Sequence, residues 1–324
     1  MRIVQNIRNV RDGYKRFCEQ GLTPEKAYKA MIDLFLQTNG LSNDIFHRLT
    51  KPAQKKISKE NLGQLVALQK DGVILIKDLV DRKTCEKLVT IFSNSPGLSK
   101  PNEPGASGKT FSQCKKEVNH FALHLSDVIS LEEVQDILCH PKILDLAEGY
   151  LGSPLVLSTA QAWWSTCYGM SAESRSDNAQ MFHFDMERIK WLKFFVYLND
   201  VRVENGPHVF VLGTHKAGSQ PKEFRNRGYA RISDGDMKEA YPAKRICEFI
   251  GEAGTAILED TRGYHKGSPP AQDARLILQV EYCTSLFGVN SRKEFPFLIK
   301  SNRLKTIVSQ NPGFLKNYPN YRIA

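Results

Sequence analysis

Three residues of this chain have the types and the spacing of a metal-binding site. His183 and Asp185 stand two positions apart, with Phe184 between them, and His265 follows much later in the chain. Two imidazoles and one carboxylate are the ligand set of mononuclear iron(II) oxygenases, where they occupy one face of the metal and leave the other open. The three residues therefore predict a bound iron(II) ion with room for a co-substrate and O2.

An arginine follows the distal histidine at short range. Arg275 lies at the start of the strand-like run Ala274–Tyr282, ten positions after His265. The planar guanidinium group can donate two parallel hydrogen bonds to one carboxylate. We therefore expect Arg275 to hold the end of a dicarboxylic co-substrate that is remote from the metal.

The spacing of His183 and Asp185 has a geometric basis on a strand. Residues i and i+2 of a strand project from the same side, so both side chains can reach one metal while Phe184 points away. The triplet alone is also compatible with a core or surface histidine that is hydrogen-bonded to a neighbour. The addition of His265 and Arg275 favours the metal site over that interpretation.

Longer stretches of the chain resemble the phytanoyl-CoA dioxygenase family over residues 65–290. Leu68–Lys77 is similar to the family's opening strand, and His140–Gly152 is similar to the helix before its β core. A core strand, an Asn-Gly turn and a histidine corner follow in the family's order, at Phe195–Asp200, Glu204–Pro207 and Val211–His215. The corner reads Leu-Gly-Thr-His where the family has Pro-Gly-Ser-His, a departure that touches no catalytic position.

The resemblance implies both a fold and a chemistry. The fold is mainly β with flanking helices, with a double-stranded β-helix (jelly-roll, cupin-like) core after an N-terminal helical segment. The chemistry is that of an oxygenase that uses Fe(II), 2-oxoglutarate and O2. By residue match, His183, Asp185 and His265 are the catalytic metal ligands, and Arg275 anchors 2-oxoglutarate.

Four further residues are candidate co-substrate contacts. Gln161 and Trp163 lie on the strand-like run Pro154–Trp164, and Phe195 matches a family position that flanks the same pocket. Lys193 shares the side of Phe195 by strand alternation and is a candidate contact for a carboxylate.

The other histidines have simpler interpretations. His208 and His215 are expected to be structural residues of a turn or strand, His215 within the corner segment. His120 and His124 stand four apart and would share one face if their segment were helical. Because the sequence offers no third ligand nearby, ordinary roles are favoured over a second metal site.

The chain divides into three parts, with an insertion in the second. Residues 1–60 are expected to be a helical extension packed on the core, residues 61–290 the oxygenase domain, and residues 291–324 a C-terminal tail. The polar insertion lies within the domain, near residues 216–247, and is expected to touch substrate.

Three local expectations follow from composition. A helix is predicted over Thr23–Phe35, with Thr23 as its N-cap residue and a proline in the first turn. The loops at residues 95–108 and 170–178 are candidate lids over the open side of the metal.

Composition is typical of a globular enzyme. The chain has 324 residues, of which 41% are hydrophobic, with no apolar run long enough to span a bilayer and no secretory signal pattern. Its seven cysteines contain no Cys-x-x-Cys pair, so neither zinc nor a disulfide framework is indicated. We expect a cytoplasmic protein that does not enter membranes. The composition is also compatible with a homo-oligomer.

The net charge of +10 raises the question of a nucleic-acid partner. Basic runs occur at residues 51–59, at 115–116 and near the C-terminus, but no stripe of aromatic residues interleaves with them as single-strand binding requires. A basic surface that attracts anionic small molecules is therefore favoured over a nucleic-acid interface.

These observations favour a dioxygenase that hydroxylates an unactivated C–H bond of a polar or anionic small molecule, with succinate and CO2 as co-products. Asp185 disfavours halogenation, because halogenases of this class lack the carboxylate so that chloride can bind; desaturation and ring formation are left open. The alternatives are an oxygenase acting on an acyl thioester or nucleic acid, and a non-catalytic cupin-like metal-binding protein, which would leave Arg275 unexplained.

Overall fold

The computed structural model describes residues 2–20, 23–50, 57–98, 108–168, 176, 179–228, 230–284 and 292–324. Most of the predicted lid segments 95–108 and 170–178, and most of the basic run 51–59, lie outside these residues. The chain begins with three helices that pack on the β core: α1 (Arg2–Gln20), α2 (Glu25–Gln37) and α3 (Leu41–Thr50). Helix α2 begins at Glu25 with Pro24 as its N-cap residue, so the predicted cap at Thr23 is wrong by one position. Pro24 fits there because its backbone is extended and it has no N–H to satisfy.

The centre of the molecule is a seven-stranded sheet with the order β1-β8-β5-β10-β4-β3-β2, paired antiparallel throughout. Its strands are β1 (Val73–Ile76), β2 (Gly97–Leu98), β3 (His120–Leu123), β4 (Val156–Ser165), β5 (Trp191–Tyr197), β8 (Ala256–Glu259) and β10 (Arg275–Cys283). A second sheet has the order β7-β6-β9, made of β7 (Ile246–Phe249), β6 (His208–Val211) and β9 (His265–Gly267). This antiparallel core with flanking helices confirms the predicted fold class, although the helices contain more residues than the strands.

The two faces of the large sheet have different roles. On β10, Leu276, Leu278 and Val280 belong to the main hydrophobic core together with residues of the flanking helices. The alternate residues include Ile277, which belongs to a smaller cluster inside the β core, and Arg275. Strand alternation thus gives β10 one face for packing and one face for chemistry.

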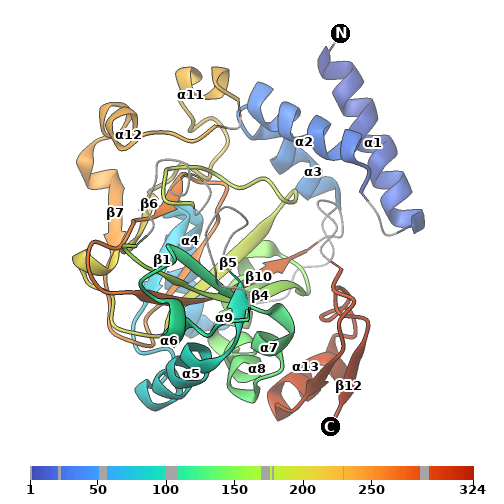
Figure 1. The fold of residues 1–324 in the computed structure, drawn as a ribbon. Helices are drawn as coiled ribbons and strands as arrows, with labels where there is room; N and C mark the ends of the chain where they lie inside the picture. The colour runs from blue at the N-terminus through green and yellow to red at the C-terminus, as the bar shows by residue number, and fades with distance from the viewer. Residues whose placement is uncertain are drawn as a thin grey trace.

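Helices cover the packing face and the ends of the core (Figure 1). They are α4 (Leu62–Asp71), α5 (Arg82–Asn94), α6 (Phe111–Cys114), α7 (Leu125–Ile129), α8 (Glu132–Leu138), α9 (Pro141–Leu151), α11 (Lys222–Asn226), α12 (Asp234–Ala240) and α13 (Asn302–Gln310). Short 3-10 turns lie at Lys59–Asn61, Val203–Asn205 and Ala243–Arg245. In Figure 1 the blue helices α1–α3 and the orange helices α11 and α12 lie at one end of the molecule, and α5–α8 lie at the other. None of the helices in the described residues is both long and apolar enough to cross a membrane.

The C-terminal segment is an ordered part of the fold. It contains α13 and a parallel pair of strands, β11 (Phe297–Ile299) and β12 (Tyr321–Ile323). Leu304 and Tyr318 are buried in the main core, and Gln135 of α8 donates from Nε2 to the Leu298 carbonyl at 2.8 Å. The segment predicted as a tail therefore closes the helical side of the core.

Candidate metal centre

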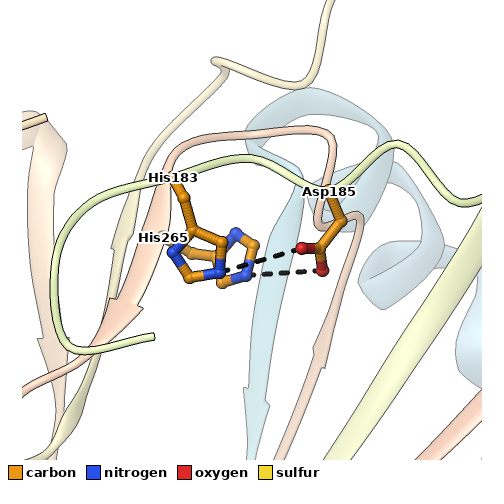
Figure 2. Close-up of side chains that lie close together, drawn as sticks. All are labelled: His183, Asp185 and His265. Atoms are coloured by element: carbon orange, nitrogen blue, oxygen red, sulfur yellow. Dashed lines mark ion pairs between the residues drawn. The ribbon is translucent and has the colours of Figure 1, made fainter. Parts of the chain in front are cut away.

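Three buried side chains converge on one point of the β core (Figure 2). The Nε2 atom of His183 lies 3.7 Å from Asp185 Oδ1, and that of His265 lies 3.6 Å from Asp185 Oδ2. One ligand atom from each of the three residues lies within 4.8 Å of the others. The structure thus brings together the three residues that the sequence predicted as metal ligands.

Backbone pairing places the two histidines side by side. The N–H of His183 donates to the His265 carbonyl at 3.0 Å, and the N–H of His265 returns a bond of 2.9 Å. The sequence predicted a strand at residues 183–185, and this prediction is wrong: the segment is held by isolated bridges from Phe182 to Ile232 and from His183 to His265. The local sequence pattern did not show that this segment pairs only through isolated bridges, because its partners are distant in the sequence.

Each imidazole is oriented by a carbonyl two residues before it. The Nδ1 atom of His183 lies 2.9 Å from the Met181 carbonyl, and that of His265 lies 3.0 Å from the Gly263 carbonyl. These contacts fix the proton on Nδ1 and leave the Nε2 lone pair for a metal. Burial lowers the pKa of both rings, which keeps them in the neutral form that binds metals.

A buried lysine faces the aspartate. Lys193 on β5 donates from Nζ to Asp185 Oδ2 at 2.7 Å and to Glu187 Oε1 at 3.2 Å, and lies 3.8 Å from Glu281 Oε2. Burial opposes ionisation of Asp185, but the charge and the hydrogen bond of Lys193 hold its pKa below the usual range. The lysine therefore keeps the aspartate charged in a buried site and orients one of its oxygens.

Replacement of Lys193 by methionine tests this arrangement. The change leaves buried carboxylates without their cation, which costs about 3–5 kcal/mol of unfolding free energy. It also removes the hydrogen bond that orients Asp185, for which we expect metal affinity to fall about 10–100-fold. Urea denaturation and competition with a metal chelator measure the two effects. The double variant Lys193→Met/Glu281→Gln should recover part of the stability, and unchanged stability in the single variant would contradict the buried pairing.

An ion pair holds the turn between β8 and β9, against which the Asp185 backbone packs. Asp260 accepts from Arg262 Nη2 at 2.6 Å and from the Tyr150 hydroxyl at 2.5 Å. The intervening Thr261 accepts the Asp185 N–H on its carbonyl at 2.7 Å. This network therefore fixes the backbone position of one metal ligand.

We predict that Asp260→Asn destabilises the protein by about 3 kcal/mol, because Arg262 is left as an unpaired buried charge. Burial opposes ionisation of Asp260, yet Arg262 lowers its pKa to about 2. A carboxyl group with a lowered pKa stabilises the fold at pH values above its pKa in the unfolded chain. This stabilisation is lost as the pH falls towards about 2. Unfolding measured from pH 6 to 2 should show that loss for the natural chain, and a smaller one for the asparagine variant.

Arg275 is a buried cation with no carboxylate partner among the described residues. Its side chain is 3% exposed, its Nε has no hydrogen-bond partner, and Nη1 makes one long contact of 3.4 Å to the Ser268 carbonyl. Burial lowers its pKa. Gly267 makes space for the group, since a Cβ there would lie 2.8 Å from Arg275 Nη2. Arg275 therefore lies beside β9, against the residue two positions after His265, and an unsatisfied buried guanidinium there is suited to bind an anion.

The family of this chain follows from its match to known proteins. Residues 68–275, which include the three ligands and Arg275, match the phytanoyl-CoA dioxygenase (PhyH) family. The chain belongs to this family. No curated protein matches the chain.

The chain is also similar to solved structures. The match to SnoN, a non-heme alpha-ketoglutarate-dependent epimerase from nogalamycin biosynthesis, has a TM-score of 0.50 at 18% identity and covers 70% of this chain and 84% of SnoN. HygX from Streptomyces hygroscopicus, crystallised with nickel and 2-oxoglutarate, gives 0.49 at 15% identity and covers 74% of this chain and 91% of HygX. At 18% identity the likeness to SnoN shows the fold alone.

The other predicted co-substrate contacts lie on the inner face of the large sheet. Strand pairing places Gln161 opposite Gln279, Trp163 opposite Ile277, and Phe195 opposite Gln279 on its other side. A cavity of about 670 Å³ adjoins this face, and Gln161, Trp163 and Gln279 are among the residues that line it. Contacts of these residues with 2-oxoglutarate stay a prediction, and Lys193 lies against Asp185.

Three of the remaining histidines lie at structural positions. His215 contacts the Gln69 carbonyl through Nε2 at 3.2 Å and lies against Gly72, whose φ of +85° suits a residue without a side chain. His120 lies on β3 and His124 is the N-cap residue of α7, so they do not share a helix face.

Two buried carboxylates near the candidate metal centre were not predicted from the sequence. Glu281 lies near Lys193, and Glu259 lies 2.7 Å from His208 Nε2, whose ring centroid is 5.8 Å from that of His265. Charged residues within the apolar runs of β8 and β10 were the available signal, since buried charges require partners.

Proposed function

We propose that this protein is an Fe(II)- and 2-oxoglutarate-dependent dioxygenase that hydroxylates a C–H bond of a polar small molecule. The observation that carries the proposal is the unpaired buried guanidinium of Arg275 next to three convergent metal ligands. A metal-binding protein without catalytic activity would have no use for a buried cation at this place. Membership of the phytanoyl-CoA dioxygenase family supports the same chemistry.

The residues fit both groups. Two neutral imidazoles and a carboxylate suit iron(II), and they bind from one side only. The unsatisfied Nε of Arg275 suits the remote carboxylate of 2-oxoglutarate, which would supply the hydrogen-bond acceptors that the protein lacks there.

In the reaction, this chain contributes position and environment. Iron and 2-oxoglutarate, when bound, supply the activation of O2, with succinate and CO2 as co-products. His183, His265 and Asp185 hold the metal, and Lys193 and Thr261 fix the aspartate. Arg275 orients the co-substrate, and the buried walls of the β core exclude water from the reacting atoms.

The ligand set bears on the type of oxidation. Asp185 is present and held in its charged form by Lys193, which leaves no place for chloride and favours hydroxylation over halogenation. SnoN is an epimerase, so hydroxylation is the part of the proposal that a product assay has to decide.

We further infer a division of labour along the chain. Residues 61–290 form the oxygenase domain, and the flanking segments support it. Phe35 of α2 stacks on Phe184 at 5.5 Å between ring centroids, and Asn43 of α3 donates to the Ile189 carbonyl at 3.1 Å. The N-terminal extension therefore packs on both sides of the Asp185 segment and is expected to be required for a stable metal site.

The test is an anaerobic titration of the metal-free protein with Fe(II) and then 2-oxoglutarate. We expect a weak visible charge-transfer band that requires both. A folded protein that gives no band with saturating amounts of both would overturn the proposal. Succinate formation with a panel of polar substrates, followed by mass spectrometry for a gain of one oxygen, then tests hydroxylation.

A further inference from the structure

The insertion at residues 216–247 contributes an extended segment beside the metal-bearing residues. The N–H of Ile232 donates to the Phe182 carbonyl at 2.8 Å, in an antiparallel bridge between Phe182 and Ile232. The segment that contains Phe182 and His183 pairs on its other side with β9, through the bridge between His183 and His265. Three extended segments thus lie side by side.

The pairing determines which residues share a face. Directly opposed residues of antiparallel segments project to the same side, and successive residues alternate. Ile232, Phe182 and Lys266 share one side: the first two are buried in one hydrophobic cluster, and the Lys266 ammonium lies 4.8 Å from the Phe182 ring centroid.

The next residue in each segment projects to the opposite side. These residues are Arg231, His183 and His265, so the register places Arg231 on the metal side, one segment beyond His183. The charges agree with this placement. Burial lowers the pKa of His183 first, and the nearby positive charge of Arg231 lowers it further.

Arg231 has no ion-pair partner among the described residues, in contrast to two cations close to it. Arg227 pairs with Asp236 at 2.8 Å, and Lys266 pairs with Asp234 at 2.7 Å. The carboxylates on the metal side are also engaged, because Asp185, Glu187 and Glu281 surround Lys193. Arg231 is half-buried, so an incoming group can reach it.

We propose that Arg231 binds an anionic group, a carboxylate or a phosphate, of the primary substrate. The inference rests on the proposed function and specifies its substrate class. A half-buried guanidinium with no protein partner holds such a group through charge-assisted hydrogen bonds, bidentate in geometry. Its position beside His183 orients the substrate so that the far end of the molecule meets the metal.

The co-substrate is a different ligand for a different arginine. Arg275 lies against Gly267, two residues along β9 from His265, which is about 6.6 Å along the strand. Arg231 lies across the strands in the other direction, beyond His183, at a segment spacing of about 4.8 Å. The two guanidinium groups therefore flank the histidine pair along different directions and suit two separate anions.

The experiment uses the full chain loaded anaerobically with Fe(II) and excess 2-oxoglutarate, so that Arg275 is occupied. Acetate and sulfate serve as probes for a carboxylate and for a phosphate-like anion, and calorimetry measures their binding. We expect saturable binding of at least one probe, weakened about tenfold or more in Arg231→Gln and partly retained in Arg231→Lys. Arg227→Gln is the matched control, because it removes a charge of the same insertion that is already paired; binding should stay within about twofold.

The charge-transfer band in the same samples separates the two proposals. A normal band in Arg231→Gln with weakened anion binding supports the inference. Equal anion binding by Arg231→Gln and the natural chain, or no saturable binding of either probe by the natural chain, overturns it. A raised 2-oxoglutarate requirement in Arg231→Gln also overturns it, since Arg231 would then serve the co-substrate. Absence of the band in the natural chain counts against the proposed function instead.

Discussion

Replacement of His183 by alanine is expected to abolish Fe(II) binding at this site and all turnover that depends on it. The imidazole is one of three ligands, and its Nε2 is presented by the contact of Nδ1 with the Met181 carbonyl. Substitutions outside the ligand set of such sites already cost about 10–100-fold in affinity, and loss of a ligand costs more. Competition with a chelator measures the metal affinity, and the iron-dependent visible band gives a second readout.

The matched control is His124→Ala, which removes an imidazole from the N-cap position of α7, outside the metal ligands. This variant should bind Fe(II) as the natural chain does. Urea denaturation of the metal-free His183→Ala protein should show a folded chain, because removal of a buried imidazole without metal leaves the Lys193 cluster intact. Unchanged iron affinity in a folded His183→Ala protein would contradict the assigned ligand.

Replacement of Arg275 by glutamine is expected to raise the 2-oxoglutarate concentration needed for half-saturation by about 100-fold. Loss of one partner of a buried charge pair costs about 2–5 kcal/mol, and about 1.4 kcal/mol corresponds to a factor of ten. Iron affinity should be unchanged, because Arg275 contacts none of the three ligands. Titration of the visible band with 2-oxoglutarate measures the shift.

Two further variants make the test specific to the guanidinium. Arg275→Lys keeps the charge but loses the two-pronged geometry, so its affinity should fall between those of arginine and glutamine. Gly267→Ala adds a methyl group 2.8 Å from Arg275 Nη2. This variant should weaken the binding of 2-oxoglutarate by displacing the guanidinium, and it should leave the metal affinity unchanged. Saturation of Arg275→Gln at the natural 2-oxoglutarate concentration would remove Arg275 from the co-substrate site.

Several elements could be predicted because their signals are local. Helix α9 begins at Pro141 and ends before Gly152, whose φ is +71°, and both signals are visible in the sequence. The strand-like runs that became β4 and β10 were identified from the sequence. The start of α2 was predicted one residue early, since Thr23 and Pro24 both suit a helix start and only the backbone decides between them.

The partners of the site were decided by pairing between distant segments. Nothing near Lys193 in the sequence indicates that it faces Asp185, Glu187 and Glu281, because the sheet register brings Glu281 opposite Lys193 across β5 and β10. The same holds for Arg231, whose side depends on a bridge between Phe182 and Ile232.

The sequence by itself predicted the candidate ligands and an arginine for the co-substrate, and it determined the family, because ligand chemistry depends on residue identity and short spacings. The tertiary structure alone decided which charges are paired. Long-range pairing surrounds Lys193 with carboxylates, buries Arg275 without a partner and directs Arg231 to the metal side. The physical reason is that the cost of a buried charge depends on its neighbours in space, and antiparallel register sets those neighbours across segments far apart in the chain.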